Sequence, residues 1–349
     1  MKILDHPGVL AAIGAAALFG AGTPVAKILL AHASPWLLAG VLYLGSGAGL
    51  WVWRKLSGAP AVQLRRAEVG WLAGAVAAGG MAGPLLLMTG LAGMSAADAS
   101  LLLNAEGVFT ALIAWFVFKE NFDRRIALGM IAIVAGAAVL SWPGRAGAGG
   151  LWPSLAVLGA CLAWALDNNL TRKVSVADAS FIAMTKGLVA GTTNLALALA
   201  TGASWPPVIV VAGAGLLGLL SYGISLVLFV VALRHLGTAR TGAYFSVAPF
   251  FGAVLAVGLL GEALTLQLVL AGVLMAVGVW LHLTERHRHL HTHEPLEHSH
   301  EHEHDEHHRH AHTDGSPDAV RHAHWHRHQP LTHEHEHYPD IHHQHPHPH

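Results

Sequence analysis

The sequence predicts an all-α integral membrane protein: ten transmembrane helices in two inverted five-helix repeats, followed by a disordered histidine-rich tail. Composition points to a membrane protein, because the chain is 53% hydrophobic and only 12% charged, far from the usage of soluble domains. A repeat follows from residues 91–142, which align without a gap on residues 233–284 at an offset of 142 positions. Inversion follows from positive residues that lie at opposite ends of the two copies.

The two copies share an apolar scaffold but not their charges. Identical pairs include Leu91/Leu233, Phe109/Phe251, Ala114/Ala256, Glu120/Glu262 and Gly136/Gly278. The positive residues Lys119, Arg124 and Arg125 align with Gly261, Leu266 and Gln267, whereas Ala92 and Asp98 align with Arg234 and Arg240. Since loops rich in Lys and Arg stay cytoplasmic, this exchange holds the second repeat inverted relative to the first. Inverted repeats are typical of carriers, whose substrate site lies between the repeats near the bilayer midplane.

Ten segments of the chain are long and apolar enough to be spans. A helix needs roughly 20 mostly apolar residues to cross the hydrocarbon core. Gly and Ala are frequent in these segments, which favours close helix packing in lipid. The predicted spans are 9–30, 35–53, 69–91, 97–118, 125–142, 152–172, 179–200, 208–232, 239–260 and 266–284.

The positive residues also predict an orientation. With the N-terminus inside, 14 Lys and Arg residues fall on the cytoplasmic side and only Arg145 falls outside. Both termini are therefore predicted to be cytoplasmic. The cytoplasmic set is Lys2, Arg54, Lys55, Arg65, Arg66, Lys119, Arg124, Arg125, Arg172, Lys173, Arg234, Arg240, Arg286 and Arg288. The predicted divisions are a first repeat at 1–143, a linker at 144–151, a second repeat at 152–284 and the tail at 285–349.

Two stretches at matching places in the halves carry a family resemblance. They are Ala96 to Asn104 with Phe118-Lys119-Glu120, and Leu236 to Pro249 with Leu260-Gly261-Glu262. With ten spans in a five-plus-five repeat, these residues resemble the EamA-type carriers of the drug/metabolite transporter superfamily. The resemblance covers about 9–284 and implies a secondary carrier without naming its substrate. The chain departs from the family pattern at Gly107, where proline is usual, and at Lys119, where glycine is usual.

Two ionisable residues inside predicted spans are candidates for the transport site. Charged residues in a membrane are costly and usually functional. At ~1.5 Å per residue, Glu106 and Lys186 both come out near the midplane, in different halves. We expect them to face the central cavity as an ion pair, or Glu106 to couple transport to protons, since a medium of low polarity favours a neutral carboxyl group. The alternative is a structural pair that holds the halves in register.

Further polar residues are candidates for the lining of the same cavity. Asp167 and Asn168 form a polar cluster that indicates either a substrate-binding step in a broken helix or a capped helix end near the interface. Asn104, Tyr222 and Tyr244 complete the candidate set, although tyrosines at span ends are as often interface anchors. Lys27 lies near the end of the first span and is expected to reach the headgroups.

The tail has a different chemistry. Of the 28 histidines, 24 lie in residues 285–349, many of them at alternate positions. A segment with so few apolar residues is expected to be disordered. Alternate residues of an extended chain project to one side, so imidazoles can converge on Zn, Ni or Co. The candidate ligands are His300, His302, His304, His333, His335 and His337. A pH-responsive polyelectrolyte and a solvated extension without function are the alternatives.

The sequence therefore predicts a multi-pass carrier of a bacterial inner membrane that exports a small metabolite or drug-like solute by alternating access. Its partners would be that solute, the lipid bilayer and divalent metal ions at the tail, with no nucleic acid, and a homodimer stays open. No cofactor is required, and no nucleotide-binding or metalloprotease motif favours an enzyme. The alternative functions are a transition-metal carrier and a membrane-anchored metal buffer or sensor. Substrate, coupling ion and direction are not encoded in any recognisable motif.

Overall fold

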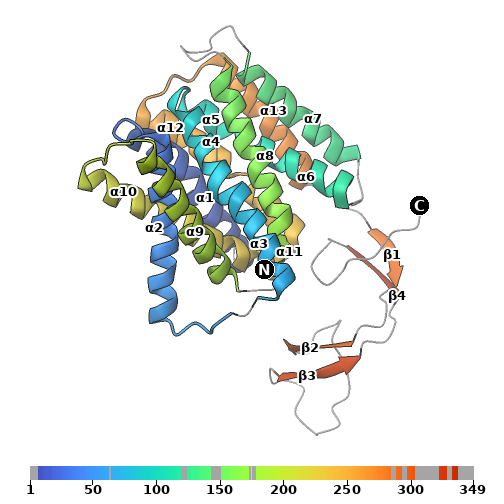
Figure 1. Cartoon of the computed structure of the whole chain (residues 1–349). Coiled ribbons are helices and arrows are strands. Elements are labelled where there is room, and N and C mark those ends of the chain that lie inside the picture. Colours follow the sequence, from blue (N-terminus) through green and yellow to red (C-terminus); the bar gives the residue numbers. More distant parts are fainter. Residues whose placement is uncertain are drawn as a thin grey trace. The chain divides into compact units, whose positions relative to one another are not determined.

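A computed structural model of the chain describes a helical unit and a separate tail unit (Figure 1). The two units are Met1–Glu285 and Arg286–His349. The described residues are 7–62, 64–118, 124–142, 151–172, 174, 178–283, 288–292, 297–302, 322–327 and 332–336. Lys119, Glu120, most of the predicted linker and the tail residues His304 and His337 lie outside them.

The first half of the helical unit begins at α1 and ends at α7. Its helices are α1 (Pro7–Leu29), α2 (Pro35–Leu56), α3 (Arg66–Ala75), the π-helix η2 (Val76–Ala82), α4 (Gly83–Ala92), α5 (Ala96–Leu102), α6 (Ala105–Phe118) and α7 (Arg124–Leu140). The second half contains α8 (Trp152–Arg172), α9 (Ala179–Ala200), α10 (Val208–Gly218), the π-helix η4 (Leu219–Ile224), α11 (Ser225–Phe245), α12 (Ala248–Leu260) and α13 (Leu266–Leu283).

These helices make the chain a multi-pass membrane protein. Within the described residues, six helical segments are long and apolar enough to cross a bilayer. Three shorter apolar helices, Ala127–Leu140, Ala248–Leu260 and Leu266–Leu281, fall on three more predicted spans. Helix α8 falls on the remaining predicted span, 152–172. The number of ten spans stays a prediction.

Corresponding helices of the two halves pack in matching pairs, with α2 against α9 and α7 against α13 (Figure 1). The remaining contacts are exchanged between halves: α1 packs on α11 and α12, while α8 packs on α4 and α6. The first helix of each half therefore packs against helices of the other half, as expected for two copies related by a pseudo-twofold axis.

Glycines allow the paired helices to approach closely. A side chain at Gly187 of α9 would collide with the backbone of Gly47 in α2, and one at Gly191 would collide with Leu44. In the other pair, Gly136 lies against α13 and Gly278 lies against α7. Gly136 and Gly278 are identical residues in the alignment of the two copies, so the repeat seen in the sequence also places this contact.

One predicted boundary is wrong. The sequence predicts separate spans at 208–232 and 239–260, but α11 continues through this interval from Ser225 to Phe245. In the first copy, Ser95 starts a new helix by accepting a hydrogen bond from the Asp98 N–H. The aligned residue of the second copy is Gly237, which has no side-chain acceptor for such a cap.

The tail unit has four short strands. They are β1 (Arg288–Thr292), β2 (Glu297–His302), β3 (His322–Arg327) and β4 (Thr332–Glu336). β1 pairs antiparallel with β4, and β2 pairs antiparallel with β3. In these four segments the strict alternation of residue types matches the period-two pattern of an extended strand. The predicted disorder of the tail when it is free stays a prediction.

Candidate functional site

Both halves contain a π-helix at the same place in the repeat. The bounds of η2 and η4 agree with the 142-position offset to within one residue. A π-helix is rare, widens the backbone by one residue per turn and releases carbonyl groups, and it occurs most often at functional sites. In η2, the carbonyl oxygen of Gly79 accepts hydrogen bonds from the Tyr43 hydroxyl and the Trp164 indole N–H, each at 2.9 Å.

A buried ion pair lies directly beside η2. The Lys186 ammonium of α9 donates to Asp167 Oδ1 at 2.5 Å and to Thr171 Oγ1 at 2.8 Å, and the Thr171 hydroxyl donates to the same carboxylate oxygen. The Lys186 and Asp167 side chains are only 9% and 11% exposed. A charge this deeply buried is retained when it is paired and hydrogen-bonded, and both conditions hold here.

The ion pair fits beside η2 because residue 79 is a glycine. A methyl group at Gly79 would overlap the Asp167 carboxylate. The Asp167 carboxylate of the second half thus lies against the backbone of η2 in the first half, at a position without a side chain. Asn194 of α9 adds a further contact between the halves, because its amide donates to the Gly80 carbonyl at 3.3 Å.

Glu106 lies at the start of α6, just after the helix break at Leu103 and Asn104. Its Oε1 accepts a hydrogen bond from the Asn168 amide at 2.8 Å. Glu106 keeps part of its surface accessible although protein surrounds it, and a side chain at the neighbouring Gly107 would meet open space. Glu106 thus lies where a polar solute or water can reach a carboxylate inside the helical unit.

The predicted ion pair between Glu106 and Lys186 is wrong. Lys186 binds Asp167, which is nineteen residues away in the chain, and Glu106 binds Asn168 instead. The reason is geometric: α8, which carries Asp167, and α9, which carries Lys186, both pack against η2, whereas α6 packs on α8. Four of the predicted residues, Glu106, Asp167, Asn168 and Lys186, therefore contribute to two neighbouring contacts along α8.

Aromatic side chains connect the halves next to these polar contacts. Phe19 of α1 packs against Trp164 and Tyr222, with ring centroids 5.9 and 5.8 Å apart. Tyr43 and Tyr222 lie 5.2 Å apart. Of these four residues, which we call the aromatic cluster, only Tyr222 is among the predicted site residues. The others occur in apolar runs, where an aromatic residue of the site cannot be told from one of the core.

The two remaining predicted residues lie elsewhere. Asn104 occupies the break between α5 and α6, where its amide donates to the Leu101 carbonyl at 3.0 Å while its side-chain oxygen is buried without a hydrogen-bond partner. Tyr244 packs on a small cluster formed by Ala11, Ala12 and Ala232 of α1 and α11. Neither residue contacts the Lys186–Asp167 pair.

The halves are also joined at the end of the unit where α2 finishes. Arg54 donates to Asp178 Oδ1 at 2.6 Å and to the Ser180 hydroxyl at 2.5 Å. Burial alone would raise the pKa of the Asp178 carboxyl, but hydrogen bonds from Ser180 and the Phe181 N–H, together with the Arg54 charge, outweigh it and hold that pKa below its ordinary value. We call these contacts the arginine clamp.

A different contact joins the halves at the opposite end. The carboxylate of Glu262, in the second half, accepts hydrogen bonds at 2.7 Å from the N–H groups of both Ala96 and Ala97 at the start of α5. Lys27 donates to the carbonyls of Leu91 and Met94, at the end of α4, at 2.6 and 2.8 Å. Lys27 thus stabilises a helix C-terminus rather than reaching lipid headgroups as predicted. We call the Glu262 contacts the glutamate clamp.

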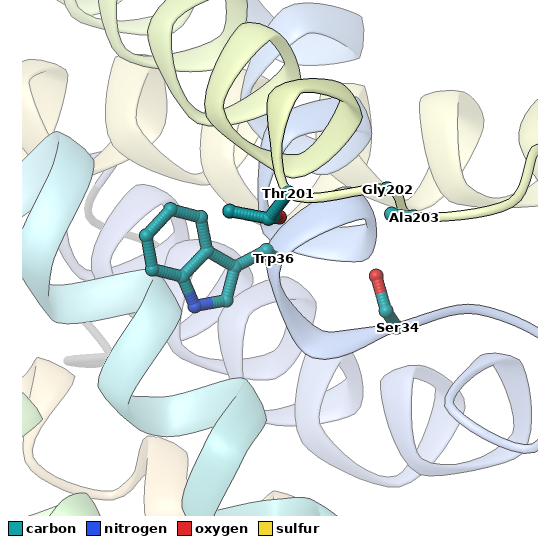
Figure 2. A pocket seen from close by; sticks show the side chains of 5 residues that line it. All are labelled: Ser34, Trp36, Thr201, Gly202 and Ala203. Carbon is teal, nitrogen blue, oxygen red and sulfur yellow. The ribbon is translucent and has the colours of Figure 1, made fainter.

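A cavity of about 390 Å³ lies at this same end, between the start of α2 and the end of α9. It is lined by Ser34, Trp36, Thr201, Gly202 and Ala203 (Figure 2). Figure 2 shows the Trp36 indole beside Thr201, with the Ser34 hydroxyl facing the turn at Gly202 and Ala203. The opposite end of the same helix pair carries the arginine clamp.

The helical unit offers no obvious metal site. Among residues whose side chains the structure describes, no group of three or more His, Cys, Asp or Glu is placed to hold a metal ion. Cys161 is buried, and its thiol donates to the Leu102 carbonyl. Of the predicted tail ligands, His300, His302, His333 and His335 fall on strands.

The central arrangement combines one ammonium, two carboxylates, amides and aromatic faces at a helix break between two repeats. Groups of these kinds bind polar organic solutes in other proteins through hydrogen bonds, ion pairs and aromatic contacts.

Comparison with known proteins finds the same family in both halves. The model of the EamA-like transporter family matches residues 6–142 and 151–284, which confirms the resemblance inferred from the sequence. A Methanothermobacter thermautotrophicus protein named "Uncharacterized transporter" is 27% identical over 294 residues, covering 78% of this chain and 85% of that protein.

Two further similarities cover different lengths. A Pseudomonas fluorescens protein named a probable 4-amino-4-deoxy-L-arabinose-phosphoundecaprenol flippase subunit ArnE is 33% identical over 105 residues, which span 30% of this chain and 91% of that protein. One solved crystal structure superposes with a TM-score of 0.61 at 18% identity, over 79% of this chain and 98% of that chain. At this identity, the likeness shows a shared fold.

Proposed function

The chain belongs to the EamA-like transporter family, and we propose that it is a secondary carrier that exports a small organic solute, a metabolite or drug-like compound, from the cytoplasm. The observation that carries the proposal is the buried Lys186–Asp167 pair beside the π-helix η2, where the two halves meet. Polar groups and released backbone carbonyls at a broken helix supply the hydrogen bonds that a solute needs when it leaves water.

We propose an orientation from the distribution of positive charge. With both termini in the cytoplasm of a bacterial cell and the chain in its inner membrane, the arginine clamp lies at the cytoplasmic end. The glutamate clamp and the cavity at Trp36 then lie at the outer end. Positive residues near the cytoplasmic surface support this assignment.

Alternating access follows from the two clamps, because each joins one half to the other at one end only. Opening the cytoplasmic side requires Arg54 to leave Asp178 and Ser180. Opening the outer side requires Glu262 to leave the start of α5. Since the halves pack through matched helix pairs, rocking about the α2–α9 contact exchanges the two openings without rebuilding either half.

The solute is proposed to bind between Glu106, Asn168 and the aromatic cluster. Glu106 Oε1 is bound to Asn168, while the other carboxylate oxygen has no hydrogen bond to a described residue. A carboxylate beside aromatic faces favours a solute with an amino group. The similarity to a relative named for an amino-sugar lipid flippase supports including aminated sugars among the compounds to be tested.

The proposal can be tested without knowing the solute. Bacterial cells would produce the wild-type chain or the Lys186→Met/Asp167→Asn variant at equal membrane levels, and metabolites in the medium would be compared by mass spectrometry. We expect at least one compound to accumulate outside wild-type cells and not outside variant cells. Identical profiles would contradict export through this site. The variant Gly258→Ala serves as the control, because its side chain would meet no other atom.

A further inference from the structure

The strands of the tail place histidine opposite histidine at every histidine position they contain. Five residue pairs are histidine pairs, and all ten histidines of β1–β4 belong to one of them. The register pairs His289 with His335 and His291 with His333 between β1 and β4, and His298 with His326, His300 with His324 and His302 with His322 between β2 and β3.

The positions between the histidines have a different chemistry. Between the histidines, the register pairs Leu290 with Glu334, Ser299 with Trp325, and Glu301 with Ala323. The strand ends pair Arg288 with Glu336, Thr292 with Thr332, and Glu297 with Arg327, so no histidine occurs at any of these positions. Because successive positions of a strand alternate between the two faces of a sheet, the histidine positions of each ladder share one face. We call the two sets of positions the outer ladder, on β1 and β4, and the inner ladder, on β2 and β3.

Distance decides which histidines can share a metal ion. Directly opposed positions in an antiparallel pair are about 4.5–5.5 Å apart at Cβ. Alternate positions along one strand are about 7 Å apart, because each residue advances about 3.4 Å. With metal–nitrogen bonds of about 2.0–2.1 Å, opposed histidine positions are the closer pair. The first chelate is thus expected across the strands.

We propose that the two ladders are binding sites for divalent transition metal ions of the Zn²⁺, Ni²⁺ and Co²⁺ class, with each ion held by histidines from opposed positions on two strands. Imidazole suits these ions without thiolate ligands. The ion also supplies what the sheets lack, since an isolated two-stranded sheet is marginally stable in water. Metal binding and strand pairing are then one event.

This proposal differs from a site built along one strand. In the ladder, His300 binds a metal ion together with His324, the residue opposite it, and His302 binds one together with His322. In a site along one strand, His300 and His302 would share an ion with each other. The nesting of the strands adds a second consequence: β2 and β3 lie between β1 and β4 in the chain. Closing the inner ladder shortens the loop that the outer ladder must close, which lowers its entropic cost. The inner ladder should fill first and favour the outer one.

A double-mutant cycle on the full-length protein in detergent tests the register. Zn²⁺ alone is titrated by calorimetry into the wild type, His300→Asn, His324→Asn and the double variant. Losing a ligand is expected to weaken inner-ladder binding by at least about tenfold. Because His300 and His324 share one ion, the double variant should lose little more than either single variant. A cycle between His300 and His333, which belong to different ladders, should be much closer to additive than the His300–His324 cycle, because these two residues bind different ions and are coupled only through loop closure.

A composition-matched variant separates register from histidine content. Ala323→His combined with His324→Ala keeps the number of histidines and moves one to the opposite face of β3. We expect this swap to weaken Zn²⁺ binding as much as His324→Asn does, whereas His342→Asn/His345→Asn, outside the described strands, should not. Unchanged affinity in the swap, or additive losses in both cycles, would overturn the ladder proposal. Neither result bears on export, which is read from the medium and depends on the helical unit.

Discussion

The residues of the central site differ in how much their neighbours determine them. Lys186 and Asp167 satisfy each other, and Thr171 and Gly79 complete the contact by a hydrogen bond and by empty space. Glu106 has a weaker partner in the neutral Asn168 amide, so its charge stays uncompensated. The charges of the ion pair are therefore satisfied within the protein, and Glu106 stays the candidate for the coupling carboxylate.

Replacing Glu106 by glutamine should remove proton coupling. The Glu106→Gln side chain keeps the size and the hydrogen bond to Asn168 but cannot release a proton. Once a solute is identified, its transport into proteoliposomes should respond to an imposed pH gradient in the wild type and lose that response in the variant. Gradient dependence that survives in Glu106→Gln would exclude Glu106 as the coupling carboxylate.

Removing one partner of the buried ion pair should cost more than removing both charges. Lys186→Met leaves Asp167 buried without its cation, and breaking such a pair costs about 3–5 kcal/mol. The double variant Lys186→Met/Asp167→Asn removes both charges and should recover a large part of this loss. Unfolding by denaturing detergent, followed by tryptophan fluorescence, measures the difference. A double variant less stable than Lys186→Met would show that Asp167 is not an uncompensated charge in the single variant.

At the scale of elements, the sequence predicts helices better than it predicts their breaks. The offset of 142 positions places the two halves and the matching positions of Gly136 and Gly278 in the packing of α7 on α13. It does not reveal that each copy contains a π-helix, because η2 and η4 lie in segments such as Val76–Ala82 that have no proline inside them. The sequence does not identify the partner of Lys186 for a similar reason. The position of a residue along a span gives its depth in the membrane, but the rotation of each helix decides which side chain meets the Lys186 ammonium. The rotation of α8 presents Asp167 to it.

Helix α9 should tolerate no added bulk where it crosses α2. Gly187→Ala would place a methyl group on the Gly47 backbone, and since a helix backbone cannot yield locally, the pair must separate at a cost of about 1–3 kcal/mol. Gly258→Ala, at an open position of α12, should be neutral or slightly stabilising, because alanine is the better helix former. Thermal unfolding in detergent compares the two. Equal stability of both variants would show that the α2–α9 contact is not tightly packed.

The arginine clamp should have a defined pH dependence. Because the pKa of Asp178 in the folded protein lies below its ordinary value, its ionised form adds stability that is fully present above the unfolded pKa, about 3.9. This stability is lost as the pH falls through the folded value. Wild type should therefore exceed Asp178→Asn in thermal stability at pH 7, and the gap should close under strongly acidic conditions. A gap independent of pH would assign the effect to capping of α9 alone.

At the scale of the whole molecule, two different clamps hold one symmetric framework. The paired helices repeat in both halves, but Arg54 and Asp178 close one end and Glu262 closes the other through backbone N–H groups. An ion pair and a helix cap respond differently to salt and to solute. The orientation of the chain in the membrane therefore decides which of the two clamps faces the cytoplasm.

The orientation can be measured with two matched serine-to-cysteine variants. Cys161 is the single cysteine of the chain and is buried, so an introduced thiol can be labelled without competition. Ser204→Cys lies beyond α9, at the end that carries the glutamate clamp, and Ser57→Cys lies beyond α2 at the other end; both positions are exposed. A membrane-impermeant maleimide added to intact spheroplasts should label Ser204→Cys at once and Ser57→Cys only after permeabilisation. The reverse pattern would place the termini and the histidine tail outside. Export would then have to begin at the glutamate clamp, because the cytoplasmic opening would be the one beside Trp36.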